Sequence, residues 1–166
     1  AADRVQPSPG DDGQHRSNVT SPYIQVYCEG VGANNNGVDC PCGNTLPPGA
    51  STGCAKRTGR GAALIPSGNP SVSNDTFVLT ATGMPLGVPG YFFEGSSTGG
   101  GVVFGNGVRC IVGPFVRLHK VAHSSGSDTF PAPGSPPISQ QLNVTAGMTT
   151  FFQVLYRDVG GPCGGT

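Results

Sequence analysis

The chain has 166 residues, of which only 11% are charged, and nine acidic residues balance nine basic ones. A neutral chain of this kind has no electrostatic footprint for nucleic acid or for an anionic membrane, and no apolar run is long enough for a transmembrane helix. The length predicts a single domain. We expect this domain to span residues 23–166, with an extended N-terminal arm at residues 1–22.

The arm is polar, contains prolines and has no hydrophobic period. Its first residues, Ala1-Ala2-Asp3, lack a methionine, and we interpret them as a mature N-terminus left after removal of a signal peptide. This interpretation predicts an exported protein, located outside the cell or at its surface.

After the arm, apolar residues form short alternating runs separated by Gly and Pro, which is the pattern of strands joined by turns. The first run, residues 23–28, leads into a strand-poor segment at 29–61, which is long for a loop unless something ties it down. Further strands are expected at residues 61–65, 71–82, 90–95, 101–105, 108–112, 114–122, 137–144 and 149–158. No window has a helical period, so the sequence predicts an all-β fold, a disulfide-stapled β-sandwich or jelly roll of short antiparallel strands.

The six cysteines indicate three disulfides, because an even count is typical of exported domains. Zinc is disfavoured, since the C-x-C spacing in the stretch DCPCGN differs from that of a zinc knuckle and no histidine lies nearby. Cys40 and Cys42 are too close to pair with each other, so we expect them to pair with Cys28 and Cys54, in an order that the sequence leaves open. This leaves Cys110 to pair with Cys163.

Three motifs resemble reactive or metal-binding sites but lack the required context. Residues 95–99 match G-x-S-x-G, yet both flanks are strand-like, which favours a hairpin over a strand–helix nucleophile elbow. His119 and His123 lie in a strand-like run, where four residues span about 13 Å, too far for both to bind one ion. Residues 34–39 lack the acidic spacing of a calcium loop. The sequence therefore predicts no catalytic residue, no metal, no cofactor and no enzymatic activity.

Three N-x-[ST] sequons are candidate glycosylation sites in an organism that modifies asparagine. They begin at Asn18, Asn74 and Asn143.

The order of short motifs resembles a known family. The motifs are YC at 27–28, CPCGN at 40–44, GC at 53–54, TGRGAALIPSGNPSVSNDTFVLTATGMP at 58–85, YFFEG at 91–95, GVVFGNGVRC at 101–110, RL at 117–118 and QVLYRD at 153–158. This order resembles a Cys-rich domain found near the C-terminal ends of large secreted proteins of planctomycetes and myxobacteria, a family without an established activity. The resemblance implies export, disulfides and an all-β fold, and it carries over no catalytic residue. Members of that family continue after the last cysteine into another hydrophobic strand, whereas nothing strand-like follows Asp158 here.

We therefore expect a non-enzymatic extracellular structural protein, a subunit of a cell-surface filament or matrix. A sheet that lacks a strand can accept one from a neighbouring molecule, and the N-terminal arm is the segment available to supply it. Prolines confine pairing to residues 4–6 and 14–20, so the candidate assembly residues are Arg4, Val5, Gln6, Gln14 and Val19. The expected partners are copies of the chain, joined head to tail. The alternative is a polysaccharide-binding or adhesion module of a secreted surface protein, although the chain has no tryptophan.

Overall fold

Eight β-strands and three short helical segments make up the regular structure of residues 24–25, 27–30, 38–121 and 124–164, the part of the chain that this computed structural model describes. The strands are β1 (Ala63–Ser67), β2 (Val78–Thr82), β3 (Gly90–Gly95), β4 (Thr98–Phe104), β5 (Gly107–Ile111), β6 (Phe115–Val121), β7 (Ser127–Phe130) and β8 (Phe151–Tyr156). The helical segments are the 3-10 turns η2 (Pro41–Gly43) and η3 (Val72–Asn74) and the four-residue helix α1 (Ile138–Gln141). The predicted all-β fold with disulfides is confirmed.

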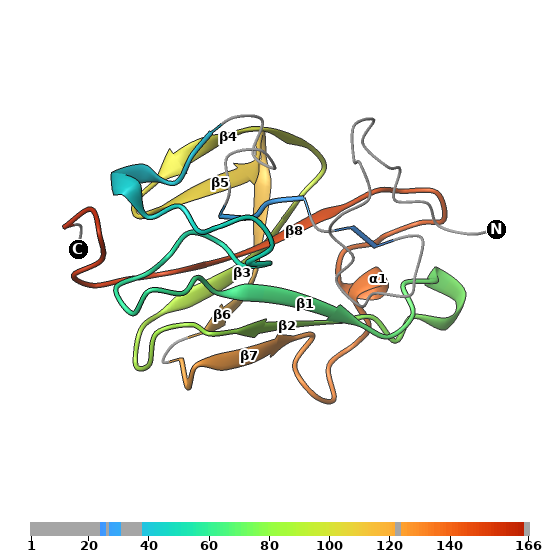
Figure 1. The fold of residues 1–166 in the computed structure, drawn as a ribbon. Coiled ribbons are helices and arrows are strands. Elements are labelled where there is room, and N and C mark those ends of the chain that lie inside the picture. Colours follow the sequence, from blue (N-terminus) through green and yellow to red (C-terminus); the bar gives the residue numbers. More distant parts are fainter. Residues whose placement is uncertain (1–23, 26, 31–37, 122–123, 165–166) are drawn as a thin grey trace.

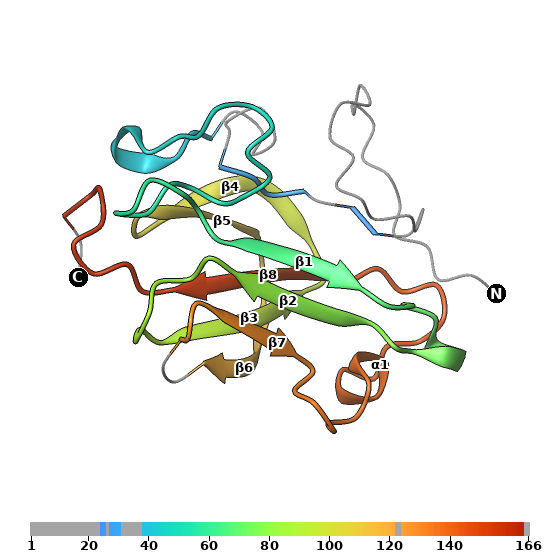
Figure 2. The same cartoon turned by 60° about the horizontal axis from the view of Figure 1, so that its bottom comes forward.

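The strands form three antiparallel sheets, with strand orders β1-β2-β7, β6-β3-β8 and β4-β5. The two three-stranded sheets enclose the main core, and Figure 1 shows β4 and β5 on the opposite side of β3 and β8. The core consists of Ala62, Phe77, Leu79, Ala81, Met84, Phe92, Phe130 and Ile138. Figure 2 shows β6 and β7 side by side, where His119 Nε2 lies 3.2 Å from Asp128 Oδ2.

The β6-β3-β8 sheet, which we call the middle sheet, has a layer on each of its two faces, and this explains the consecutive aromatic residues of β3. Phe92 faces the main core and contacts Phe130, whereas Phe93 points the other way and contacts Phe115. Successive side chains of a strand alternate between its two faces, so adjacent buried phenylalanines require a layer on each side. The β4-β5 sheet supplies the second layer, and Gly95 has no room for a Cβ because Ile111 of β5 lies against it.

The strands predicted at residues 23–28 and 137–144 differ from the structure, and one observed strand, β7, was not predicted. The described residues of the first expected strand, Ile24, Gln25, Tyr27 and Cys28, lie outside any strand. Residues 137–144 contain α1 instead of a strand, and the Ser139 N–H donates to Asp75 Oδ2 at 2.7 Å, which attaches this helix to the loop before β2. The sequence also gave no indication of β7, because Ser127 and Asp128 at its start are polar.

All six cysteines are paired, as Cys28–Cys110, Cys40–Cys54 and Cys42–Cys163. The predictions of three disulfides and of no Cys40–Cys42 bond are confirmed, and Cys54 pairs with one of these two cysteines as expected. The predicted Cys110–Cys163 pair is wrong, and so is the prediction that Cys28 pairs with Cys40 or Cys42. The chain turns back after β8, and the Cys163 N–H donates to Asn106 Oδ1 at 3.2 Å, which places Cys163 beside Cys42. Three disulfides are typical of proteins in an oxidising compartment.

Three glycines, Gly30, Gly53 and Gly61, lie where turns of the strand-poor segment between Cys28 and β1 contact one another. The Gly30 N–H donates to Thr52 O at 2.7 Å and the Gly53 N–H donates to Ala62 O at 2.8 Å. A Cβ at Gly61 or at Gly30 would collide with the Gly53 backbone, so these close approaches require glycine.

The disulfide pattern predicts a definite order of reduction. Cys40, Cys54 and Cys110 are buried, whereas Cys42 is exposed and Cys163 is half-buried. A mild reductant should therefore open Cys42–Cys163 first, because a thiolate reaches an exposed sulfur more readily. Because only Pro41 lies between Cys40 and Cys42, proteolysis leaves both cysteines on one peptide. Stepwise reduction with alkylation, followed by mass spectrometry, assigns a partner to each of them. A Cys110–Cys163 linked peptide, or a free thiol in the untreated protein, would contradict the pairing.

Candidate functional site

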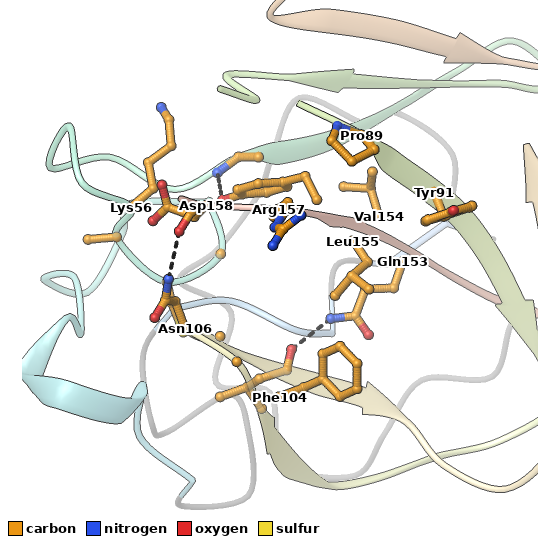
Figure 3. A pocket seen from close by; sticks show the side chains of 18 residues that line it. Lys56, Pro89, Tyr91, Phe104, Asn106, Gln153, Val154, Leu155, Arg157 and Asp158 are labelled. Carbon is orange, nitrogen blue, oxygen red and sulfur yellow. Dashed lines mark hydrogen bonds between the residues drawn. The ribbon is translucent and has the colours of Figure 1, made fainter. Parts of the chain in front are cut away.

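A pocket of about 430 Å³ lies between the end of β8, the β4–β5 turn and residues 53–56. Its walls include Tyr91 of β3, Phe104 of β4, Val108 of β5 and Leu155 of β8. Figure 3 shows Phe104 on one side of the opening and Leu155 and Arg157 on the other. The pocket therefore lies on the outer face of the middle sheet, where the smaller β4-β5 sheet leaves that face uncovered.

The side-chain amide of Gln153 forms the inner end of this pocket and completes β5. Its Oε1 accepts the Cys110 N–H at 3.1 Å, and its Nε2 donates to Val108 O at 2.8 Å (Figure 3). A primary amide offers one acceptor and a donor, which are the groups that a neighbouring strand would offer to this edge. The same Nε2 lies 3.5 Å from Cys28 Sγ. Gln153 thus joins β8, β5 and the Cys28–Cys110 disulfide.

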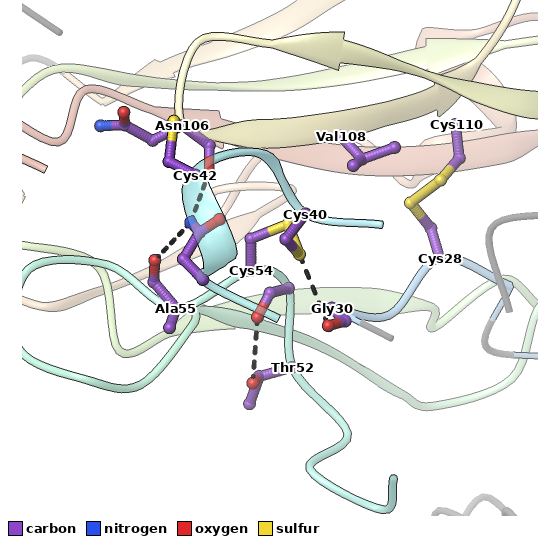
Figure 4. The surroundings of a disulfide bond; sticks show 12 residues. Cys28, Gly30, Cys40, Cys42, Thr52, Cys54, Ala55, Asn106, Val108 and Cys110 are labelled. Carbon is purple, nitrogen blue, oxygen red and sulfur yellow. Dashed lines mark hydrogen bonds between the residues drawn. A yellow bond between two sulfur atoms is a disulfide. The ribbon is translucent and has the colours of Figure 1, made fainter. Parts of the chain in front are cut away.

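Two asparagines fix the outer walls of the pocket. Asn44 is only 6% exposed, and its Nδ2 donates to Ala55 O and to Asn106 O, both at 2.8 Å. Asn106 Nδ2 in turn donates to Asp158 O at 3.1 Å. Figure 4 shows Asn106 beside Cys42 and opposite Ala55, so the Cys42–Cys163 disulfide closes the same group of contacts. The pocket walls are held in place without a ligand.

Three charged residues line the pocket, the cations Lys56 and Arg157 and the anion Asp158. Their net charge is positive. The Asp158 carboxylate accepts the backbone N–H of Arg57 at 3.1 Å. Neither cation forms an ion pair within the described part of the chain. In Figure 3 the Arg157 side chain extends into the space between β8 and Phe104, whereas the Lys56 ammonium points away from Phe104.

Tyr156 contributes an uncharged phenol to the pocket wall. Burial raises its pKa, and the backbone N–H of Ala62, which its hydroxyl accepts at 3.3 Å, acts in the opposite direction. Tyr156 therefore stays uncharged at neutral pH.

A second feature is the presence of two seven-residue edge strands, β4 and β6. Among the described strands, β4 pairs only with β5 and β6 only with β3. Of the ten exposed large apolar side chains among the described residues, half lie on these two strands, which makes β4 and β6 the most apolar strand edges of that part of the chain. These side chains are Val102, Val103, Phe104, Phe115 and Val116.

The residues predicted for assembly and modification are only partly described. Arg4, Val5, Gln6, Gln14, Val19 and the first sequon at Asn18 lie outside the described residues. Asn74 ends η3 and Asn143 follows α1 in a turn with φ of 52°, and both are exposed. Their exposure makes the two asparagines accessible, while their glycosylation stays a prediction.

The three motifs that resemble reactive sites have the following positions. Residues 95–99 connect β3 to β4, which belong to different sheets, so the expected hairpin is wrong and the segment is a crossover. The Ser97 hydroxyl donates to Val112 O at 3.0 Å, and a strand follows it where an elbow would have a helix. His119 binds Asp128, while His123 and most of residues 34–39 lie outside the described part.

Sequence reasoning missed the pocket and the role of Gln153. The pocket is built from five stretches of the chain that come together only in the fold, at residues 53–56, 62, 89–91, 104–108 and 153–158. Gln153 reads as one polar position of an alternating strand. The run QVLYRD contained the relevant residues, but no pattern in it indicates that the amide faces a strand edge.

No family model, curated protein or solved structure matches this chain. The resemblance to a Cys-rich family therefore stays a prediction. Over the described residues, no group of three His, Cys, Asp or Glu side chains could hold a metal ion, and no helix could cross a bilayer.

The role of Gln153 can be tested by Gln153→Leu, which keeps the approximate volume but removes both polar groups. The Cys110 N–H and Val108 O would lose their partner, and each unpaired buried group costs about 1–3 kcal/mol. We expect urea unfolding of the oxidised protein to give a free energy of unfolding lower by about 2–4 kcal/mol.

The matched control is Gln140→Leu, on the exposed face of α1. It should change the free energy of unfolding by less than about 0.5 kcal/mol. Equal effects of the two substitutions would show that Gln153 does not cap β5.

Proposed function

We propose that this protein is a non-enzymatic extracellular structural subunit that assembles into a filament or matrix by strand addition. The observation that carries the proposal is the pair of edge strands, β4 and β6, with exposed apolar side chains. Val103 is 53% exposed and Val116 is 57% exposed. An open apolar strand edge is a template for pairing with another chain, and monomeric proteins usually protect such edges.

Of the two edges, β6 is the better acceptor. The pairing of β4 with β5 is irregular between Thr98 and Val102, where three glycines interrupt the register. This irregularity leaves only Val102 to Phe104 as a regular edge, whereas β6 runs for seven residues beside β3 with one register shift. Arg117 and Lys120 on β6 would limit indiscriminate pairing, as charged residues commonly do on edge strands.

The proposed donor is the N-terminal arm of a second copy. Its segment 14–20, QHRSNVT, has the same length as β6 and contains β-branched residues at its end. An extended chain spans roughly 3.3 Å per residue, so an arm of about 20 residues could reach a neighbouring subunit. A contact between an arm and a distant edge is heterologous, and repetition without ring closure gives a filament.

The disulfides support the proposed extracellular location. Three disulfides suit an oxidising environment, and a weakly charged, covalently tied β-domain suits a protein exposed to proteases. We propose secretion to the cell surface on these grounds.

Deletion of residues 1–20 tests the arm. We expect the shortened chain to fold, to form all three disulfides and to sediment as a monomer, because the described core and cysteines remain. The full chain should form polymers under the same conditions. Polymers of the shortened chain in equal yield would exclude the arm as the linker.

Lysine substitutions test the acceptor edge. Val116→Lys on β6 should reduce polymerisation strongly, since lysine on an edge opposes pairing, while Val103→Lys on β4 should have a smaller effect. The matched control is Val159→Lys, at a position that is also 57% exposed but lies outside every strand. Loss of polymers in the Val103→Lys variant alone would move the acceptor to β4.

A further inference from the structure

The pocket at the end of β8 has the properties of a preformed ligand site. Its volume of about 430 Å³ lies within the range of roughly 300–1,000 Å³ that is usual for small-molecule sites. Its walls are joined by the side chains of Asn44, Asn106 and Gln153 and by the Cys42–Cys163 disulfide. A site that needs no rearrangement avoids much of the ordering cost of binding.

Arg157 gives this site a preference for a carboxylate. Within the described residues its guanidinium forms no ion pair, and the exposed Arg157 side chain borders the opening (Figure 3). The carboxylate of Asp158, which also lines the pocket, accepts the backbone N–H of Arg57. A guanidinium binds a carboxylate through two parallel hydrogen bonds, and this pairing is stronger than one between neutral groups. Because the whole chain has no net charge, the attraction is local to this pocket.

The opposite wall suits a ring with an apolar face. Phe104 lines the opening with a ring that is 49% exposed, and Leu155 and Val108 extend the apolar surface inward. The C–H face of a pyranose packs on such a ring. A ligand with a ring for Phe104 and a carboxylate for Arg157 would use both walls at once.

The backbone around the pocket does not favour a peptide strand. The carbonyl group of Val108 already accepts a hydrogen bond from Gln153, and the Cys110 N–H already donates to the same side chain. The carbonyl groups of Ala55 and Asp158 accept hydrogen bonds from Asn44 and Asn106, respectively. Strand addition depends on open main-chain donors and acceptors. These main-chain groups already have partners, so the proposed recognition uses side chains.

We infer that the pocket binds a uronic-acid residue of an anionic polysaccharide, with Arg157 holding the carboxylate and Phe104 packing on the sugar ring. This inference concerns a different surface from β6 and does not depend on the proposed assembly. A subunit with such a site would attach to acidic polysaccharide outside the cell.

Calorimetric titration of the full oxidised chain with oligogalacturonate tests the inference, and the same oligosaccharide with its carboxylates reduced to neutral alcohols provides the comparison. We expect the acidic form to bind at least about tenfold more tightly, because hydrogen bonds to charged groups contribute about 1.5–3 kcal/mol. Binding should weaken as salt is raised. Equal affinity for the two forms, or no binding of the acidic form at millimolar concentration, would overturn the inference.

Two variants locate the binding at the pocket. Arg157→Ala and Phe104→Ala should each weaken binding by about tenfold or more, whereas Arg60→Ala, which removes an exposed arginine outside the lining, should leave it unchanged. Circular dichroism of each variant checks that the fold is retained. Unchanged binding by folded Arg157→Ala would contradict the assignment. A peptide of residues 1–20 that bound, with the same dependence on Arg157, would assign the pocket to the arm and also overturn it.

Discussion

The rest of the structure depends on the covalent attachment of a segment that cannot bury enough apolar surface to hold itself in place. Among the described residues between Cys28 and β1, only Ala62 belongs to the main core, and the other buried side chains are those of Glu29, Cys40, Asn44 and Cys54. The Cys28–Cys110 and Cys42–Cys163 disulfides close sequence separations of 82 and 121 residues. On the chain-entropy model, one bridge over a loop of that length lowers the free energy of folding by about 4–5 kcal/mol, comparable to the whole stability of a small domain.

This attachment determines where the functional surfaces lie. The segment covers one end of the molecule, where Asn44 reaches Asn106 and where the tail returns to Cys42. Near the same end, Gln153 completes β5 beside the Cys28–Cys110 bridge. The pocket forms between these parts, while no described strand pairs with the outer edges of β4 and β6. The cysteines thus hold the strand-poor segment at the end that carries the pocket, and β6, the proposed acceptor edge, contributes no residue to the pocket lining.

The sequence predicted the elements well where local alternation determines them, and poorly where distant segments determine the result. The strand expected at residues 90–95 is β3 with the same bounds, because Gly90 and Gly95 end a strongly apolar run. The pairing of Cys163 depends on where the chain returns after β8, and the site around Gln153 depends on how β8 packs against β5. No local pattern encodes either. β7 is a strand only because Thr80 and Ala81 of β2 pair with Thr129 and Asp128.

The central claim, that the chain is a self-assembling structural subunit, is tested most directly by the size of the particle that the oxidised full chain forms. Analytical ultracentrifugation combined with electron microscopy of the same sample measures this size across a range of protein concentrations. The account predicts filaments or sheets of regular width that grow with concentration. A single species of 16.7 kDa at every concentration, with no ordered polymer in the images, would contradict it.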